Sequence, residues 1–276
     1  MINKNNIKIK LGICQWAMPI EGPGCIKLAA NLGFEGVELE MVKPERGFPL
    51  SKKFVQDIYL EEKTKYGVYF PSIAINILDF YCMTGPADLV ETKIALAAID
   101  KAIDSAIYMG IPTVQIPCFN KNEIHGKNFE KAVEIFKNAC TKAEEHNITI
   151  GFESILSLND IRQMLDAVDK KNFKVYFDTQ NHFAFRGYEI AELLEKLFTY
   201  ICEIHVKDGK KDQISSSILG EGDSNFYKTM EVIKKYKYEG WLLLENYYDQ
   251  EPLSLKNKNS LELIQKDLNI LKGAII

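Results

Sequence analysis

Short apolar runs alternate with longer amphipathic segments along the chain. The apolar runs are rich in Val, Ile, Phe and Tyr, which favour buried strands. They predict strands at residues 10–16, 36–40, 69–76, 113–119, 149–154, 174–180, 202–208 and 241–246. A helical pattern follows each strand, most clearly at residues 51–67, 87–110 and 128–147. The last two of these patterns close with Gly110 and Asn147, which readily take the left-handed conformation found at helix C-termini.

The strict alternation of strand and helix has a topological consequence. Strands separated by a helix-length crossover pair in parallel, and eight such units can close into one barrel. No linker or change in composition marks a domain boundary within the 276 residues. We therefore predict the α/β class, with a single (β/α)₈ TIM barrel over residues 1–276 as one domain.

Metal-binding types of side chain stand at the ends of four consecutive strands. They are Glu153, Asp178, His205 and Glu245. In a barrel of this kind the carboxyl ends of the strands carry the reactive groups. Three carboxylates meeting at one end would repel one another unless a cation bound them, so we expect a divalent ion there. Mn²⁺ is our first expectation, and Mg²⁺, Co²⁺ and Zn²⁺ suit the same ligands.

Such a site suits proton transfer at the carbon beside a carbonyl group. A divalent ion stabilises the enediolate that forms when the proton leaves. Inversion at that carbon needs a base on one face and an acid on the other. We expect Glu153 and Glu245 to be this pair as well as metal ligands, with Asp178 and His205 acting as ligands only.

Further polar residues near the strand ends are candidates for substrate contact. Lys207 lies two residues beyond His205 and so on the same face of its strand, although it could also be a solvated loop lysine. Glu221 lies in the glycine-flanked loop LGEGD, and Glu38 could face the substrate or form a structural ion pair. Asn76 is a candidate for a hydroxyl or phosphate contact, and Trp16 for an apolar wall beside the substrate.

Composition narrows the class of partner. The formal net charge is −4, which disfavours a nucleic-acid backbone as the main partner. No apolar run approaches the length of a membrane span, and the polar start MINKNNIKIK does not read as a signal peptide. The six cysteines form no C-x-x-C pair. We expect a cytoplasmic protein with reduced thiols.

The ordered motifs resemble a known family. NLGFEGVELE, SIAIN, GFES, YFDTQN, EIHVKDG, LGEGDSNF and GWLLLEN together are similar to the sugar phosphate isomerase/epimerase superfamily, the xylose isomerase-like TIM barrels. Within it, the chain most resembles L-ribulose-5-phosphate 3-epimerase and the ketose 3-epimerases. The resemblance implies the same four metal ligands, the same glutamate pair, a sugar or sugar phosphate substrate, and a homo-oligomer, either dimer or tetramer.

The chain departs from the family pattern after the sixth strand. Free-sugar epimerases resemble D-x-x-H there, whereas this chain has DTQNH, with Asn181 at the expected place and His182 one residue later. The sugar-phosphate branch resembles D-x-G-N, which Asn181 fits and in which Gln180 replaces the glycine. Both Asn181 and His182 are candidates for substrate contact. An inosose dehydratase-like lyase and a hydroxypyruvate isomerase-like enzyme remain alternatives to the epimerase.

Overall fold

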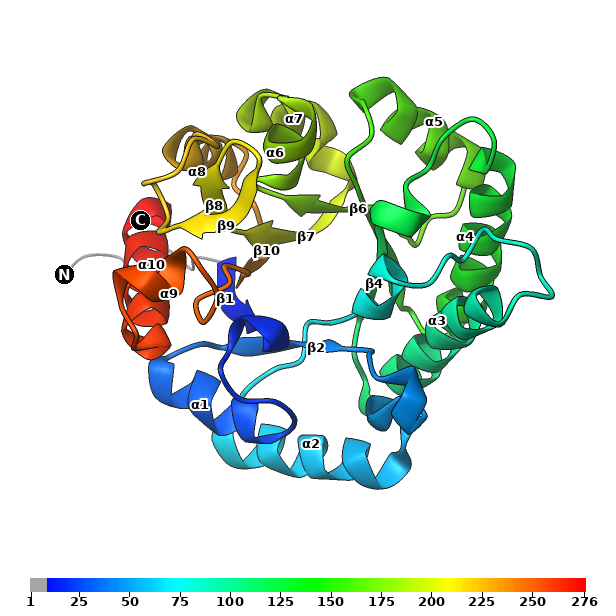
Figure 1. Ribbon diagram of the computed structural model, residues 1–276, viewed down its shortest axis with the longest axis horizontal. Coiled ribbons are helices and arrows are strands. Elements are labelled where there is room, and N and C mark those ends of the chain that lie inside the picture. The colour runs from blue at the N-terminus through cyan, green and yellow to red at the C-terminus, as the bar shows by residue number, and fades with distance from the viewer. Residues whose placement is uncertain (1–8) are drawn as a thin grey trace. The chain divides into compact units, whose positions relative to one another are not determined.

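The computed structural model describes residues 9–276, and the first eight residues of the polar start lie outside this range (Figure 1). The chain divides into two compact units. The first comprises the described residues up to Val37, then Gly67–Tyr69 and Phe177–Ile276. The second comprises Glu38–Tyr66 and Phe70–Tyr176. That residues 1–276 act as one domain stays a prediction.

Eight parallel strands form the main sheet. They are β1 (Ile9–Cys14), β2 (Gly36–Glu40), β3 (Ser72–Ala74), β4 (Thr113–Cys118), β5 (Thr149–Ser154), β6 (Phe173–Asp178), β7 (Ile201–Val206) and β10 (Gly240–Leu244). Their hydrogen-bonded order is β1-β10-β7-β6-β5-β4-β3-β2, which is the topology of a closed barrel. This order confirms the predicted α/β barrel class.

The third strand is much shorter than the run at 69–76 predicts. Tyr69 forms an isolated parallel bridge with Gly36, and the strand resumes only at Ser72. Pro71 stands between them and has no backbone N–H to donate to a neighbouring strand. The proline therefore interrupts the ladder that the apolar pattern implied.

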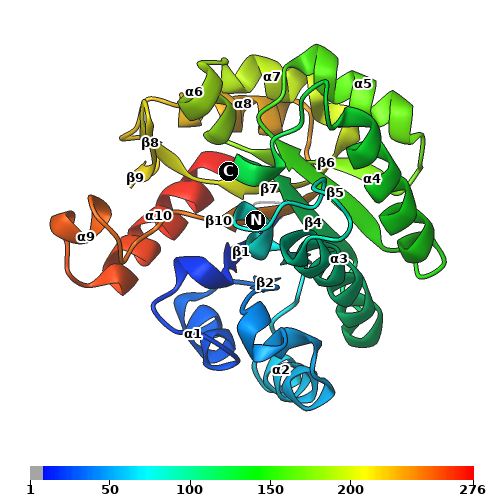
Figure 2. The same cartoon turned by 45° about the vertical axis from the view of Figure 1, so that its right-hand side comes forward.

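In the first unit, helices cover the strands that carry most of the candidate residues. These helices are α1 (Gly24–Leu32), α6 (Asn181–Arg186), α7 (Ile190–Leu197), α8 (Phe226–Lys235), α9 (Leu253–Lys256) and α10 (Ser260–Ile275). Helix α8 packs against both α7 and α10 (Figure 2). A short antiparallel hairpin, β8 (Asp208–Lys210) and β9 (Gln213–Ser217), follows β7 and was not predicted.

In the second unit, α2 (Lys53–Tyr66), α3 (Val90–Met109), α4 (Phe129–Glu144) and α5 (Leu158–Val168) contact one another in chain order (Figure 1). The core beneath α4 is aromatic. The ring of Phe136 lies 5.3 Å from that of Phe152 and 4.9 Å from that of Phe173, measured between centroids. Burying three such rings together contributes strongly to stability, because each removes a large apolar area from water.

The predicted helix end at Gly110 is confirmed, whereas α4 ends at Glu144, three residues before Asn147. Gly110 follows α3 with a φ of 65°, and its N–H bonds to carbonyls of the last helical turn. Asn147 follows α4 with a φ of 57°. These left-handed residues turn the chain into β4 and β5.

All six cysteines lie in the described part of the chain, and none of them forms a disulfide bond. Among residues 9–276, no helix is both long and apolar enough to cross a bilayer.

Candidate active site

Three of the four predicted metal ligands come together at strand ends within the first unit. Asp178 is the last residue of β6, His205 lies on β7, and Glu245 directly follows β10. The register of β10 against β7 pairs Leu243 with His205, which places Glu245 just beyond the histidine. All three side chains are almost fully buried.

Asp178 is held by both of its carboxylate oxygens. Oδ1 accepts hydrogen bonds from the backbone N–H groups of Gln180 (2.7 Å) and Asn181 (2.5 Å). Oδ2 lies 3.1 Å from the Lys207 ammonium nitrogen. Burial raises the pKa of Asp178 above its ordinary value, and the Lys207 charge opposes that shift.

Glu245 lies beside three nitrogen groups, those of Trp16, His205 and Lys207. The Trp16 indole N–H donates to Oε1 at 3.2 Å, and Lys207 donates to Oε2 at 2.6 Å. His205 Nδ1 also lies 3.2 Å from Oε2. Burial acts to raise the pKa of Glu245, but His205 and Lys207 outweigh it and hold that pKa below its ordinary value. Glu245 is therefore an ionised carboxylate at neutral pH.

Lys207 is a buried ammonium placed between two buried carboxylates. Its side chain is 2% exposed. Its backbone is fixed by Thr179, whose hydroxyl accepts a hydrogen bond from the Lys207 N–H (3.0 Å) and donates one to the Lys207 carbonyl (2.8 Å). With a neutral imidazole, the group of Asp178, Glu245, Lys207 and His205 carries one net negative charge.

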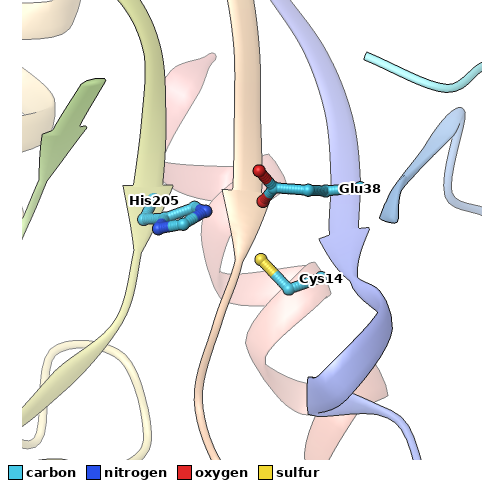
Figure 3. A group of neighbouring side chains, drawn as sticks. All are labelled: Cys14, Glu38 and His205. Carbon is cyan, nitrogen blue, oxygen red and sulfur yellow. The ribbon is translucent and has the colours of Figure 1, made fainter. Parts of the chain in front are cut away.

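His205 has two further neighbours from the start of the chain. Its ring meets the Trp16 ring edge-on, with centroids 5.8 Å apart. Cys14, the last residue of β1, places its sulfur within 4.8 Å of a His205 ring nitrogen (Figure 3). Trp16 was predicted as an apolar wall, yet its N–H is also used, on Glu245.

The fourth predicted ligand, Glu153, belongs to the second unit. It lies on β5 and is 3% exposed. Gln115 of β4 donates its side-chain amide to Glu153 Oε2. The β4–β5 register pairs Gln115 with Gly151 and Pro117 with Glu153, so the four positions share one face. Because Gly151 has no side chain, the Gln115 side chain can extend along the strands toward Glu153.

Sequence reasoning missed Gln115. A signal was available, because a polar amide in the apolar run TVQIPC is unusual for a buried strand. Gln115 is 2% exposed. What the sequence lacked was the register that sets it beside Glu153.

Two other candidates in the second unit have partners of their own. Glu38 on β2 is fully buried, and its Oε1 accepts hydrogen bonds from the hydroxyls of Ser72 and Tyr176, both at 3.0 Å. Asn76 donates to Glu40 Oε2 at 3.4 Å. Substrate contact by Glu38 or Asn76 stays a prediction.

Asn181 and His182 begin helix α6 and are buried. The His182 ring stacks on Phe177, with centroids 6.2 Å apart, and lies equally far from Tyr188. Gln180 uses its side chain to hold the β8–β9 hairpin: its amide donates to the Gln213 carbonyl, and its carbonyl accepts from the Ser215 N–H. Gln180 therefore fixes the hairpin to the segment that follows β6.

Glu221 lies on the surface in its loop. Its two oxygens accept from Lys256 (2.8 Å) on α9 and Lys266 (2.7 Å) on α10. These lysines lower the pKa of Glu221 below its ordinary value. Substrate contact by Glu221 stays a prediction. Glu221 would have to break its ion pairs with Lys256 and Lys266 to make that contact.

Asp208 organises this loop through its side-chain hydrogen bonds. Its buried carboxylate accepts from the N–H groups of Gly209, Gly220 and Gly222 and from the Ser224 hydroxyl, at 2.8–3.0 Å. A side chain at Gly222 would meet Asp208 Oδ1 at 2.0 Å. Gly222 is therefore required for the loop to close on this aspartate.

The donor set of the first unit fits a divalent cation. Two carboxylates and one imidazole, all buried and on neighbouring strands, are the oxygen and nitrogen donors that Mn²⁺, Mg²⁺ and Zn²⁺ accept. Asp178 and His205 each offer a ligand atom within 4.8 Å of the other. The same carboxylates can also accept or return a proton.

Comparison with known proteins identifies the family. Residues 26–273 match the model described as xylose isomerase-like TIM barrel, and the chain belongs to this family. The resemblance expected from the sequence motifs is thereby confirmed.

Named relatives include both epimerases and dehydratases. The chain is 26% identical over 227 residues to 2-epi-5-epi-valiolone 7-phosphate 2-epimerase of Actinoplanes sp., covering 82% of each chain. It is 25% identical over 305 residues to inosose dehydratase of Mesomycoplasma hyopneumoniae, covering 98% of this chain and 97% of the relative. The D-psicose 3-epimerase of Clostridium cellulolyticum H10, solved with D-tagatose, shares the fold with a TM-score of 0.77 and 16% identity, over 96% of this chain and 99% of that one.

Proposed function

We propose that this member of the xylose isomerase-like TIM barrel family is a divalent-metal-dependent epimerase of a ketose or ketose phosphate. The observation that carries the proposal is the buried meeting of Asp178, His205 and Glu245 at three strand ends. A protein that only bound sugar would have no need to bury two carboxylates beside an imidazole, since burying charge is costly.

Four residues would hold the ion. Asp178, His205 and Glu245 offer their ligand atoms in the first unit, and Glu153 is the fourth by its place on β5, the strand hydrogen-bonded to β6. Mn²⁺ is our first choice among the ions this donor set accepts. When bound, the ion supplies charge stabilisation to substrate oxygens as a proton leaves the adjacent carbon.

Glu245 and Glu153 are the proposed acid/base pair. Glu245 is ionised, which is the form that takes a proton from carbon, and the Trp16 N–H on Oε1 fixes the plane of its carboxylate. Glu153 is oriented by the Gln115 amide in the same way. If each carboxylate serves one face of the substrate carbon, proton removal by one and return by the other inverts the configuration.

The names of the relatives support a substrate class, because they refer to 2-epi-5-epi-valiolone 7-phosphate, inosose and D-psicose. We propose a small sugar or sugar phosphate as the partner and no nucleic acid. Lys207, Asn181 and His182 are the proposed contacts from the first unit. A homo-oligomer and a cytoplasmic location stay predictions.

A dehydratase is the second candidate. It is favoured by the inosose dehydratase that matches 98% of this chain. It would use the same proton removal and then expel a β-hydroxyl group as water. The two functions therefore separate at the product and share the first step.

The test is proton exchange into substrate. The purified protein, with and without added Mn²⁺, is incubated in D₂O with D-fructose, D-tagatose, L-ribulose 5-phosphate or an inosose. After the metal is stripped, the products are read by NMR and mass spectrometry. Glu245→Gln removes the base. Glu231→Gln, an exposed glutamate on α8, is the matched control.

Metal-dependent deuterium at C3 with inverted configuration is the expected result, abolished in Glu245→Gln and retained in Glu231→Gln. Loss of water from the inosose would instead establish the dehydratase. Full exchange in Glu245→Gln would remove that residue from the pair. Absence of both exchange and dehydration across the panel would count against both functions.

A further inference from the structure

Lys207 places one positive charge on two carboxylates that are also proposed metal ligands. Its ammonium nitrogen is 2.6 Å from Glu245 Oε2 and 3.1 Å from Asp178 Oδ2. The three side chains are between 1% and 9% exposed. Buried carboxylates are stable only when a cation or several donors compensate their charge, and Lys207 supplies that cation from within the chain.

The oxygens used by Lys207 are the ones a divalent ion needs. Glu245 Oε2 is also the oxygen nearest His205 Nδ1, at 3.2 Å, so it lies where the imidazole and the carboxylates converge. The other oxygens already accept hydrogen bonds from different donors. Glu245 Oε1 accepts from Trp16, and Asp178 Oδ1 accepts from the backbone N–H groups of Gln180 and Asn181. An ammonium and a divalent cation on the same oxygen repel each other strongly in a buried setting.

The backbone and the side chain of Lys207 are restrained differently. Thr179 fixes the Lys207 N–H and carbonyl with hydrogen bonds of 3.0 and 2.8 Å. The ammonium sits at the end of a four-carbon stem with several rotatable bonds. The charge can therefore move without disturbing the strand end that carries it.

We propose that Lys207 is an internal counter-ion that exchanges with the divalent metal: it neutralises Glu245 and Asp178 in the metal-free protein and leaves Glu245 Oε2 when the ion binds. This rests on the proposed metal site and gives Lys207 a role distinct from substrate contact. Its consequence is that the metal-free site stays folded, and that metal affinity is set partly by the cost of displacing the lysine.

The test uses Mn²⁺ alone and needs no substrate. Lys207→Met removes the charge and keeps the stem. Lys210→Met is the matched control, because Lys210 is exposed and forms its ion pair with the surface residue Asp223 (2.9 Å). The dissociation constant for Mn²⁺ is measured at pH 8 by calorimetry and by electron paramagnetic resonance of the free ion. Thermal unfolding is followed with EDTA and with saturating Mn²⁺.

If Lys207 competes with the ion, Lys207→Met binds Mn²⁺ at least tenfold more tightly than the wild type, whereas Lys210→Met stays within twofold. In EDTA, Lys207→Met unfolds at a lower temperature than the wild type, and saturating Mn²⁺ reduces this difference in unfolding temperature. An unchanged or weaker affinity in a folded Lys207→Met protein overturns the exchange while leaving the metal site intact. Failure of both wild type and variant to bind Mn²⁺ overturns the metal assignment and the exchange together.

A second measurement covers the case in which Lys207→Met does not fold. The wild-type protein is labelled with ¹³Cε-lysine, and the Lys207 signal is assigned by its loss in Lys207→Arg. Titration with diamagnetic Mg²⁺ should shift this signal as the ammonium leaves its carboxylates. Saturation by Mg²⁺, confirmed by calorimetry, without a shift of the Lys207 signal overturns the proposal.

Discussion

Asp267 makes the stability of the first unit depend on pH. This α10 carboxylate is fully buried and accepts from the Leu219 N–H, the Asn246 amide and the Tyr248 hydroxyl at 2.8–2.9 Å. Burial, only partly offset by these donors, raises the pKa of Asp267 from 3.8 to about 6. The side chain ties α10 to the residue that follows Glu245.

The sign follows from proton binding. Between the unfolded pKa of 3.8 and the folded pKa of about 6, the native state binds more protons than the unfolded state. Stability contributed by the protonated carboxyl is present below 3.8 and is lost as pH rises through about 6. A shift of this size corresponds to about 3 kcal/mol in total, of which about 2 kcal/mol falls between pH 4.5 and 7.5.

Asp267→Asn removes the ionisation and keeps an acceptor oxygen. The free energy of unfolding in urea is measured for the wild type and for Asp267→Asn at pH 4.5 and at pH 7.5. Subtracting the variant from the wild type at each pH cancels the contributions of all other titrating groups. We expect the wild type to lose about 2 kcal/mol relative to the variant over this interval. Asp166→Asn, which changes an exposed aspartate on α5, is the matched control. A wild-type-to-Asp267→Asn difference that is constant with pH would refute the reasoning.

Three further predictions concern the aromatic core, the contact between Gln115 and Glu153, and the loop that contains Gly222. Phe136→Ala should lower the free energy of unfolding by about 3–5 kcal/mol, because its fully buried ring leaves a cavity beside Phe173, and urea denaturation measures this; a loss under 1 kcal/mol would contradict the packing. Gln115→Leu should weaken Mn²⁺ binding roughly 10- to 100-fold, because it removes the donor that orients Glu153, and calorimetry measures this. Unchanged affinity would show that the Gln115 amide does not position Glu153 for metal binding. Gly222→Ala should destabilise the loop by about 1–3 kcal/mol, because the added carbon would stand 2.0 Å from Asp208 Oδ1. Limited proteolysis should then cut within residues 218–225 faster than in the wild type, and equal cleavage rates would be evidence against the clash.

The fold class was predictable because its signal is local. Alternating apolar strands and amphipathic helices recur in every repeat, and helix ends such as Gly110 depend only on the conformation of one residue. The errors lie where a local signal competes with chain geometry. Pro71 shortens the third strand, and the hairpin after β7 arises from residues that the pattern reads simply as a turn.

The roles of the site residues were only partly accessible. Asp178, His205 and Glu245 could be picked out because each ends an apolar strand, and parallel strand ends of one sheet lie at one edge. The sequence predicted Lys207 and Glu221 as substrate contacts. In the structure Lys207 pairs with buried carboxylates, and Glu221 pairs with surface lysines of α9 and α10. Whether either also contacts substrate stays a prediction.

The sequence by itself determined which residue types stand at which strand ends, because period-two alternation and turn residues are properties of short segments. Only the tertiary structure decided which polar side chains form ion pairs or hydrogen bonds with each other. The pairing of Lys207 with Glu245 spans 38 residues, and that of Gln115 with Glu153 depends on the register between two strands. Hydrogen bonds and ion pairs act over a few ångströms, so they are set by packing and register rather than by position along the chain.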